Sequence, residues 1–231
     1  MGYLRRLWNR FVPASPRDRE AAAQGVDAEG RGASVLDESY KKKIEVEKAI
    51  YKDMLNVNEL PEIFHYWSNK YLGPMFREYG FANSDELFAK YLVESARRCS
   101  AKHPVFISVG VGNCDTEVRV AKLIRAAGLT DFVIECLDIN PHMLERGKEL
   151  ARQEGVLENL AFIEGDFNNW TAPRTYTGVI ANQSLHHVLN LEGLFEQIKK
   201  SLDPRGYFIT HDMIGRWQAK RLATWCRRKT A

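Results

Sequence analysis

Apolar residues along 103–215 form short continuous runs that alternate with runs of helical spacing. The short runs are rich in β-branched and aromatic side chains and predict buried strands at 105–109, 132–137, 160–164, 178–181 and 207–211. Between them, apolar positions recur every three or four residues and predict helices at about 115–127, 141–154 and 191–202. Strands that alternate with helices form a parallel sheet with right-handed crossovers. We therefore expect an α/β, Rossmann-like core over 103–215, with helices on both faces of the sheet.

The preceding block, residues 37–102, has helical spacing and many aromatic residues. Three helices are predicted in it, over about 40–56, 60–71 and 85–100. Gly73-Pro74 is expected to end the second helix, and Ser84 or Asn83 to cap the third. The second helix and its end carry candidate substrate contacts, namely Phe64, His65, Tyr66, Trp67 and Tyr71. We expect a helical cap, which either covers the active site or serves as an ordinary packing layer.

The two ends of the chain differ from the rest in composition. Residues 1–36 have almost nothing to bury after Pro13 and are predicted to be a disordered extension. Residues 216–231 are rich in Arg and Lys and are predicted to be a basic tail.

Composition and charge narrow the classes of function. The net charge of the 231-residue chain is only +3 and the basic residues are spread out, so we do not infer nucleic-acid binding. No apolar run approaches the roughly 20 residues of a membrane span, so we expect no stable membrane insertion. The four cysteines form neither a CxxC pair nor a zinc-ligand spacing and resemble reduced thiols. These features predict a cytoplasmic protein without a metal site, and they leave oligomerisation possible.

The residues best suited to bind a ligand directly follow the predicted strands. Gly110 and Gly112 come after the first strand, where they let the backbone turn tightly and a ligand approach it closely. Ligands of such sheets bind at the carboxyl ends of the strands, where Asp138, Asp166 and Asn182 follow the second, third and fourth. Strand, glycine turn, helix and a following acid together indicate a nucleotide-binding site.

The two carboxylates have a functional and a structural interpretation. Asp138 can accept hydrogen bonds from both hydroxyl groups of a ribose. It could instead cap the next helix, although Asn140 fits that role better. Asp166 can accept an adenine amino proton while Phe167 packs near the ring, or it can be a solvated loop acid.

Five segments, taken in order, resemble the class I S-adenosylmethionine-dependent methyltransferases: VFISVGVGNCDTEV, ECLDIN, FIEGDF, VIANQSLHHV and LFEQIKKSLDPRGYFITHDMIG. The resemblance covers about 104–214 and implies S-adenosylmethionine as the cofactor. It places the glycine turn around the methionine moiety and the acid after the second strand on the ribose. It also places the acid after the third strand near adenine, and the residues after the fourth near the methyl group. These roles fall on Gly110, Val111 and Gly112, on Asp138 and Ile139, on Asp166 and Phe167, and on Asn182 and Gln183.

The chain departs from the family pattern at three places. Ser108 stands where the family often has an acid, two residues before the first glycine. Cys114 stands at the third small position of the turn, which is often glycine. A full domain of this class continues past the fifth strand with two more strands, and we see no room for them after Gly215. We therefore expect the sheet to lack strands six and seven.

Two adjacent histidines follow the fourth strand, where the resemblance places the transferred methyl group. Much of the rate can come from holding an oxygen or nitrogen nucleophile in line with the methyl group and close to it. A histidine can also take the proton of the nucleophile. We therefore predict His186 or His187 as a catalytic base, with a place in the wall of the substrate pocket as the alternative. His211, at the end of the fifth strand, could contact substrate or simply be satisfied by Asp212 or the backbone.

The sequence thus predicts methyl transfer to an oxygen or nitrogen atom of a small-molecule or glycan-type acceptor. The chain lacks the Asn/Asp-Pro-Pro-Tyr/Phe pattern of enzymes that methylate amino groups of DNA bases or protein amides. One alternative is an NAD(P)-dependent oxidoreductase, which shares the first turn and the acid after strand two. Against it, Asp115 occupies the place of the third glycine of its motif. The other alternative is a non-catalytic, shortened relative that only binds.

Overall fold

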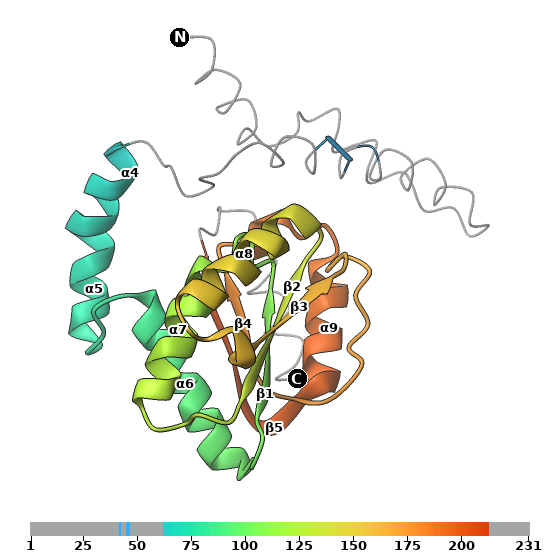
Figure 1. The fold of residues 1–231 in the computed structure, drawn as a ribbon. Helices are drawn as coiled ribbons and strands as arrows, with labels where there is room; N and C mark the ends of the chain where they lie inside the picture. Colours follow the sequence, from blue (N-terminus) through green and yellow to red (C-terminus); the bar gives the residue numbers. More distant parts are fainter. Residues whose placement is uncertain (1–41, 43–44, 47–61, 213–231) are drawn as a thin grey trace, which may run out of the picture. The chain divides into compact units, whose positions relative to one another are not determined.

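The structure, a computed structural model, describes residues 42, 45–46 and 62–212 (Figure 1). The predicted disordered extension, most of the helix expected over 40–56, the basic tail and any strand beyond residue 212 lie outside these residues. The chain divides into two compact units, Met1–Ile50 and Tyr51–Ala231, and the sheet lies in the second. Among the described residues, no helix is both long and apolar enough to span a membrane.

The core is a five-stranded sheet whose paired strands all run parallel, in the order β3-β2-β1-β4-β5. Its strands are β1 (Val105–Val109), β2 (Val133–Asp138), β3 (Leu160–Glu164), β4 (Tyr176–Asn182) and β5 (Leu202–His211). The expected Rossmann-like fold is therefore confirmed. The strand order reverses between β1 and β4, and ligands of open α/β sheets bind at the carboxyl ends of the strands beside such a reversal.

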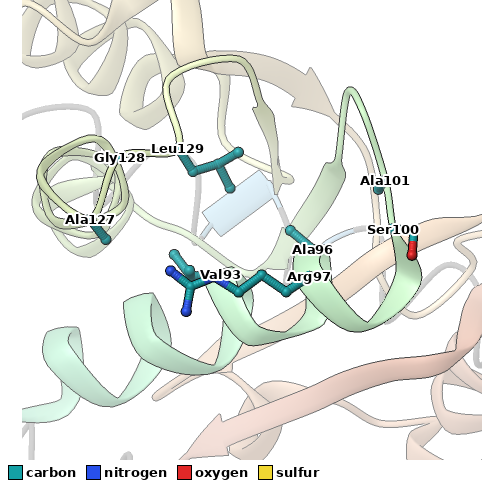
Figure 2. A pocket seen from close by; sticks show the side chains of 8 residues that line it. All are labelled: Val93, Ala96, Arg97, Ser100, Ala101, Ala127, Gly128 and Leu129. Atoms are coloured by element: carbon teal, nitrogen blue, oxygen red, sulfur yellow. The ribbon is translucent and has the colours of Figure 1, made fainter.

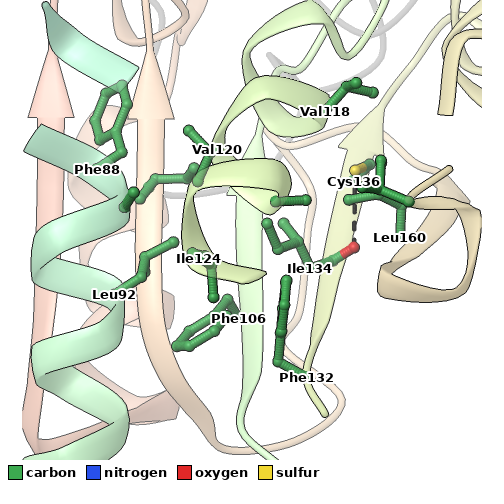
Figure 3. Close-up of a cluster of buried hydrophobic side chains, with 14 of the residues drawn as sticks. Phe88, Leu92, Phe106, Val118, Val120, Ile124, Phe132, Ile134, Cys136 and Leu160 are labelled. Carbon is green, nitrogen blue, oxygen red and sulfur yellow. Dashed lines mark hydrogen bonds between the residues drawn. The ribbon is translucent and has the colours of Figure 1, made fainter. Parts of the chain in front are cut away.

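Helices cover both faces of the sheet (Figure 1). Within the described part of the chain, four helices pack on it: α6 (Ser84–Cys99), α7 (Asp115–Ala126), α8 (Pro141–Gln153) and α9 (Leu191–Ser201). The first three share one buried cluster with Phe106 and Ile134, part of which Figure 3 shows. On the other face, α9 packs with Ile107 and Val179. Neighbouring residues of β1 point to opposite faces, as the two-residue period of a strand requires. Of the two roles left open for the helical block, α6 takes that of a packing layer.

The helix starts follow the predicted capping chemistry. The side chain of Asn83 accepts a hydrogen bond from the backbone N–H of Glu86, so Asn83 rather than Ser84 caps α6. The side chain of Asn140 accepts from the backbone N–H of His142 at the start of α8. Because Asn140 caps α8, Asp138 is not needed as the cap of this helix and is available for another role.

The predicted break at Gly73-Pro74 is wrong. The helix α4 (Glu62–Trp67) continues through one π-helical segment, η1 (Ser68–Leu72), into α5 (Gly73–Glu78). Pro74 is at the start of α5, where the fixed φ of proline suits the first turn of a helix. The wider π-helical turn before it lets the chain change register without ending the helix.

The fifth strand begins earlier than the predicted residue 207. Leu202 pairs with Tyr176, whereas Tyr207 pairs with Gly178, so residues 203–206 bulge out of the ladder. The turn chemistry read from Asp203-Pro204-Arg205-Gly206 is present inside this bulge, where Asp203 Oδ1 accepts from the backbone N–H of Arg205 at 2.8 Å. The sequence signal for a turn was correct, but it interrupts the strand rather than preceding it.

Candidate functional site

The glycine turn joins the carboxyl end of β1 to α7. Gly110 and Gly112 have φ of 72° and 55°, in the left-handed region that favours glycine. A Cβ atom on Gly110 would lie 2.5 Å from the Cβ of Ser184, so this position also excludes a side chain for lack of space. Ser184 is itself fixed, because its hydroxyl donates to the carbonyl of Val109 at 2.6 Å. The turn is thus shaped for close approach to its backbone.

Neighbouring elements tie the turn down. The backbone N–H of Gly110 donates to the carbonyl of Leu137 at 2.8 Å, and Arg146 of α8 donates to the side-chain oxygen of Asn113 at 3.0 Å. Val111 packs against the first buried cluster, which leaves its backbone rather than its side chain as the group suited to a ligand. Cys114 has a φ of 58°, so the residue that replaces the third glycine keeps a glycine-like conformation.

Asp138, the predicted ribose ligand, is buried at the end of β2 and contacts the glycine turn. Its Oδ2 accepts from the backbone N–H of Gly112 at 2.8 Å, and its Oδ1 accepts from that of Asn140 at 2.9 Å. Each carboxylate oxygen can accept more than one hydrogen bond, so these contacts leave acceptor capacity for a ligand. Asp138 therefore orders the turn, and Ile139 beside it is half-buried.

Asp166 and Phe167 follow β3, next to the same turn. The carboxylate of Asp166 accepts from the backbone N–H of Asn168 at 2.9 Å and from the side-chain amide of Asn169 at 2.7 Å, as in an Asx turn. A Cβ on Gly110 would lie 3.6 Å from Phe167 Cε1, so the Phe167 ring stands beside the glycine turn. The structure thus brings this loop and the turn together.

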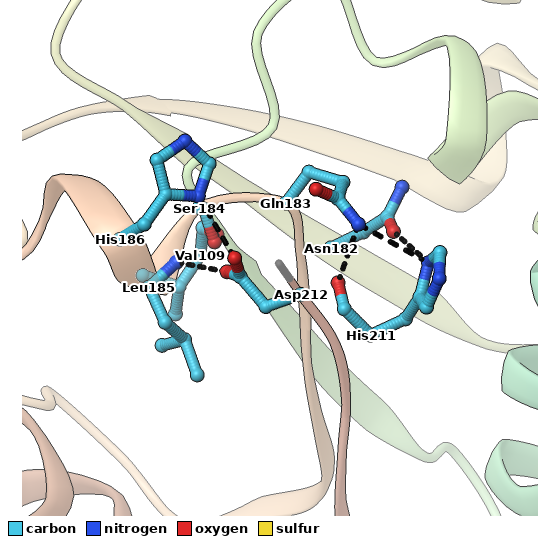
Figure 4. Close-up of polar contacts among 8 residues, drawn as sticks. All are labelled: Val109, Asn182, Gln183, Ser184, Leu185, His186, His211 and Asp212. Carbon is cyan, nitrogen blue, oxygen red and sulfur yellow. Dashed lines mark hydrogen bonds and ion pairs between the residues drawn. The ribbon is translucent and has the colours of Figure 1, made fainter. Parts of the chain in front are cut away.

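A chain of polar contacts links the carboxyl end of β4 to the end of β5 (Figure 4), and one further contact links it to α7. The side-chain amide of Asn182 donates to Thr116 Oγ1 at 2.9 Å, and its oxygen lies 3.2 Å from His211 Nδ1. Burial lowers the pKa of His211, which favours the neutral ring. Because the Asn182 side-chain oxygen can only accept, this contact requires the hydrogen of the neutral ring on Nδ1. Gln183 has a φ of 53°, and its backbone N–H donates to the carbonyl of His211 at 2.8 Å. Asn182 and Gln183 are thereby fixed where β4 and β5 end.

Asp212 pairs with His186 and not with its neighbour His211 (Figure 4). Its Oδ1 lies 2.8 Å from His186 Nδ1, and its Oδ2 accepts from the backbone N–H of Leu185 at 2.7 Å. Burial raises the pKa of Asp212, but the His186 and Leu185 contacts outweigh it and hold the pKa below its usual value. An ionised Asp212 fixes the Nδ1–H form of His186, and Nε2 is then the nitrogen that can take a proton.

The two candidate histidines differ in environment. Both lie in the 3₁₀ helix η3 (Leu185–His187), and their ring centroids are 4.1 Å apart. The His186 side chain is 22% exposed and its Asp212 partner 1%, whereas His187 is exposed. Only His186 has the oriented, partly buried position that suits a general base.

Sequence reasoning missed a buried acid beneath the glycine turn. Glu117, in the first turn of α7, is 1% exposed, and its Oε1 accepts from the Ser108 hydroxyl at 2.6 Å. Its other oxygen, Oε2, is buried and has no hydrogen-bond partner within the described part of the chain. Burial raises the pKa of Glu117 to about 7, although Ser108, the residue's own backbone N–H and Arg119 lower it. One signal was available: residues 117, 120, 121 and 124 share a helix face, and the other three are apolar.

We expect Glu117→Gln to stabilise the ligand-free protein at pH 8. The pKa of Glu117 is about 7 in the folded protein and 4.5 as the ordinary value in the unfolded chain. Between pH 4.5 and about pH 7, the carboxyl group is therefore protonated when the protein is folded and ionised when it is unfolded. The free energy of unfolding consequently falls as the pH rises through this window. Glutamine is neutral throughout, and the variant should gain up to about 3 kcal/mol at pH 8 but only about 1 kcal/mol at pH 5. Urea unfolding at both pH values measures this. The exposed Glu154→Gln is the control, and equal stabilities of wild type and Glu117→Gln at pH 8 would contradict the assignment.

A cavity of about 300 Å³, whose lining side chains Figure 2 shows, is formed by segments away from the candidate site. Its lining comes from the end of α6 and from the connection between α7 and β2, with these residues: Val93, Ala96, Arg97, Ser100, Ala101, Ala127, Gly128 and Leu129. These segments precede β1 and β2, so the cavity is near the amino ends of the strands and is separate from the site at their carboxyl ends.

Comparison with known families agrees with this geometry. Residues 102–230, more than half of the chain, match the family described as a methyltransferase domain. The chain belongs to the class I S-adenosylmethionine-dependent methyltransferase family. Membership in this methyltransferase family removes the support for the nicotinamide-dependent oxidoreductase considered as an alternative.

Relatives within this methyltransferase family are distant. The chain is 26% identical over 191 residues to the sterol 24-C-methyltransferase of Candida albicans, and the matched region covers 79% of the chain and 50% of that protein. It is 26% identical over 176 residues to the cycloartenol-C-24-methyltransferase of Arabidopsis thaliana, and the matched region covers 73% of the chain and 49% of that protein. The chain thus spans about half the length of these curated relatives.

Solved structures include similar chains. A putative sarcosine dimethylglycine methyltransferase from Galdieria sulphuraria matches with a TM-score of 0.47 and 20% identity, over 62% of this chain and 54% of that one.

Proposed function

We propose that the protein transfers the methyl group of S-adenosylmethionine to an oxygen or nitrogen atom of a small-molecule acceptor. The observation that carries this proposal is the oriented His186–Asp212 pair at the carboxyl end of β4, on the edge of the sheet that also holds the glycine turn. The family assignment supplies the cofactor class, and the local geometry supplies a base.

The residues around the turn fit this cofactor. Gly110 lacks the Cβ that Ser184 would exclude, and Asp138 presents a carboxylate at the end of β2. We assign Gly110, Val111 and Gly112 to the methionine moiety and Asp138 with Ile139 to the ribose. Asp166 and Phe167 are assigned to adenine, and Asn182 and Gln183 to the region of the methyl group. When bound, the cofactor supplies an electrophilic methyl group.

In the proposed mechanism, His186 takes the proton of the acceptor at Nε2. Asp212 keeps the hydrogen on Nδ1 and stabilises the positive charge that the ring gains, because the carboxylate is held ionised by His186 and Leu185. Asn182 and Gln183 keep their positions through contacts to Thr116 and His211. A base of this kind suits an acceptor that must lose a proton, as a hydroxyl or amine does.

The acceptor is proposed to be a small molecule rather than a macromolecule. The relatives in Candida albicans and Arabidopsis thaliana are named as methyltransferases of sterols and of cycloartenol, so sterols belong in the first acceptor panel. Phe76 of α5 meets the ring of His211 edge to face, with centroids 5.4 Å apart. The helical block thus reaches the carboxyl end of β5, which supports a cap that contacts the acceptor. Glycan-type acceptors form the second half of the panel.

Two measurements test the proposed function. Calorimetry with S-adenosylhomocysteine should give saturable binding, and transfer of a labelled methyl group from S-adenosylmethionine should occur with an acceptor of the panel. Binding without transfer to any hydroxyl, amine or sterol acceptor would favour the non-catalytic binding protein. Failure to bind S-adenosylhomocysteine would refute the proposal.

We expect Asp138→Ala to weaken S-adenosylhomocysteine binding by about 1–3 kcal/mol, because a buried, charged acceptor is lost. Part of this loss is indirect, since Asp138 also accepts from Gly112. Asp138→Asn keeps the contact of Oδ1 with the backbone N–H of Asn140 and should therefore lose less binding free energy than Asp138→Ala. Calorimetry on both variants, with the exposed Asp131→Ala as control, measures the change. A dissociation constant equal to that of the wild type would contradict the ribose assignment.

A further inference from the structure

The buried acid Glu117 has features that a purely structural residue would not need. It places a carboxyl group on the apolar face of α7, against β1, where Val120, Ala121 and Ile124 are fully buried. One of its oxygens has no hydrogen-bond partner among the described residues, and such a group normally costs stability. A residue that costs stability and lies beside a candidate site is a candidate for function.

The position of Glu117 relates it to the glycine turn. The turn begins two residues after Ser108, whose hydroxyl donates to Glu117 Oε1, and ends at Cys114, three residues before Glu117. The carboxyl group is therefore hydrogen-bonded to the strand that enters the turn and interacts with Cys114 at the end of the turn, which is the segment assigned above to the methionine moiety of the cofactor. The first turn of α7 adds a second attraction for negative charge, because backbone N–H groups there lack helical partners.

The other ionisable groups around Glu117 leave its charge uncompensated. On α7 itself, Asp115 opposes ionisation and Arg119 favours it. Arg119, however, is held by Asp85 of α6, with its Nε 2.6 Å from Asp85 Oδ2. The facing groups of the turn and of β2 are the buried thiols Cys114 and Cys136, whose pKa values are both raised. Ser108 of β1 offers a hydroxyl but no charge. A positive charge brought by a ligand would complete this arrangement.

We propose that Glu117 is the counter-charge for the ammonium group of the cofactor's methionine end and that it releases its proton to solvent when this ammonium binds. The proposal rests on the proposed function. In it, the O–H bond of the Glu117 carboxyl group breaks, the electron pair stays on the carboxylate and the proton leaves to the buffer. Glu117 acts as a positioning residue in this role and takes no part in methyl transfer.

Proton-linked binding has a measurable signature. With a pKa of about 7 in the ligand-free protein, the group is roughly half protonated at pH 7, so binding should release about half a proton there. The dissociation constant of S-adenosylhomocysteine should rise about tenfold from pH 8 to pH 6 for the same reason. Glu117→Gln should release no proton and should lose the part of the pH dependence due to Glu117.

The experiment is calorimetry at pH 6, 7 and 8 in buffers of different ionisation enthalpy, on wild type and on Glu117→Gln. S-adenosylhomocysteine carries the ammonium group, whereas 5′-methylthioadenosine lacks the whole amino-acid end and should release no proton from either protein. Proton release with S-adenosylhomocysteine that is equal in wild type and Glu117→Gln would overturn the inference. Release with S-adenosylmethionine but not with S-adenosylhomocysteine would overturn it too, because it would assign the effect to the sulfonium.

A second variant keeps Glu117 and changes only its environment. The Ser108 hydroxyl lowers the pKa of Glu117, so Ser108→Ala should move the pH midpoint of S-adenosylhomocysteine binding upward. An unchanged midpoint would contradict the proposal even if Glu117→Gln failed to fold. If the wild-type protein bound S-adenosylhomocysteine at no pH, the proposed function itself would fail, which is a different outcome from binding without linked protons.

Discussion

Replacing His186 by glutamine is expected to lower kcat by about 10²–10⁴-fold, the usual contribution of a positioned general base. Glutamine preserves an approximate shape and can donate to Asp212 but cannot take a proton at neutral pH. The dissociation constant of S-adenosylhomocysteine should stay within about threefold of the wild type, because the loss is specific to proton transfer. Steady-state kinetics with the acceptor found in the panel, together with calorimetry, measure both quantities.

Two further variants separate catalysis from folding. Asp212→Asn should also lower kcat, because an amide can favour the other ring form of His186 and does not stabilise its positive charge. The control is His103→Gln, since His103 pairs with Asp131 at 2.5 Å in a second His–Asp contact that is exposed and lies before β1. A kcat in His186→Gln equal to that of the wild type would show that His186 only lines the pocket.

Replacing Gly110 by alanine is expected to destabilise the protein by about 2–5 kcal/mol and to weaken cofactor binding by more than about tenfold. A left-handed φ of 72° costs an L-residue roughly 1–2 kcal/mol. A Cβ 2.5 Å from the Cβ of Ser184 adds an overpacking cost of about 1–3 kcal/mol. Urea unfolding and S-adenosylhomocysteine titration measure the two effects.

The chain offers a matched control for this variant. Gly155 has a φ of 70°, and nothing lies within 4 Å of a Cβ built on it, so Gly155→Ala carries the conformational cost alone. Ser184→Gly in the Gly110→Ala background should recover part of the difference by removing the clashing atom. If Gly110→Ala and Gly155→Ala were equally stable, close packing against Ser184 would not be what restricts the turn.

Much of the fold followed from residue patterns because the patterns were local. The runs at 105–109 and 160–164 matched β1 and β3 at both ends, since both are short, mainly apolar runs directly followed by turn residues. The errors came where local signals compete with tertiary pairing. Gly73-Pro74 and Asp203-Pro204 are both sequences that usually end a helix or strand. In the structure, however, Gly73-Pro74 begins α5 directly after a π-helical turn, and Asp203-Pro204 lies in a bulge within β5.

The site was less predictable than the fold. Turn glycines and strand-end acids are recognisable because spacing along the chain places them at the carboxyl edge of the sheet. The partner of Asp212 was not, because the adjacent His211 faces Asn182 while His186, 26 residues away in sequence, reaches the carboxylate. Glu117 and Ser108 likewise meet only through the packing of α7 on β1. Pairings of this kind depend on three-dimensional placement, which a single sequence does not encode locally.

The close packing of α8 against the glycine turn bears on how a ligand would bind. A Cβ on Gly147 would lie 2.7 Å from Cys114 Sγ and 2.9 Å from the carbonyl oxygen of Asn113, so the helix and the turn leave no space between them. With its backbone also held by Leu137 and Asp138, the turn has little freedom left to lose. The conformational entropy of the loop is thus given up when the chain folds, and affinity for a ligand then depends mainly on desolvation and direct contacts.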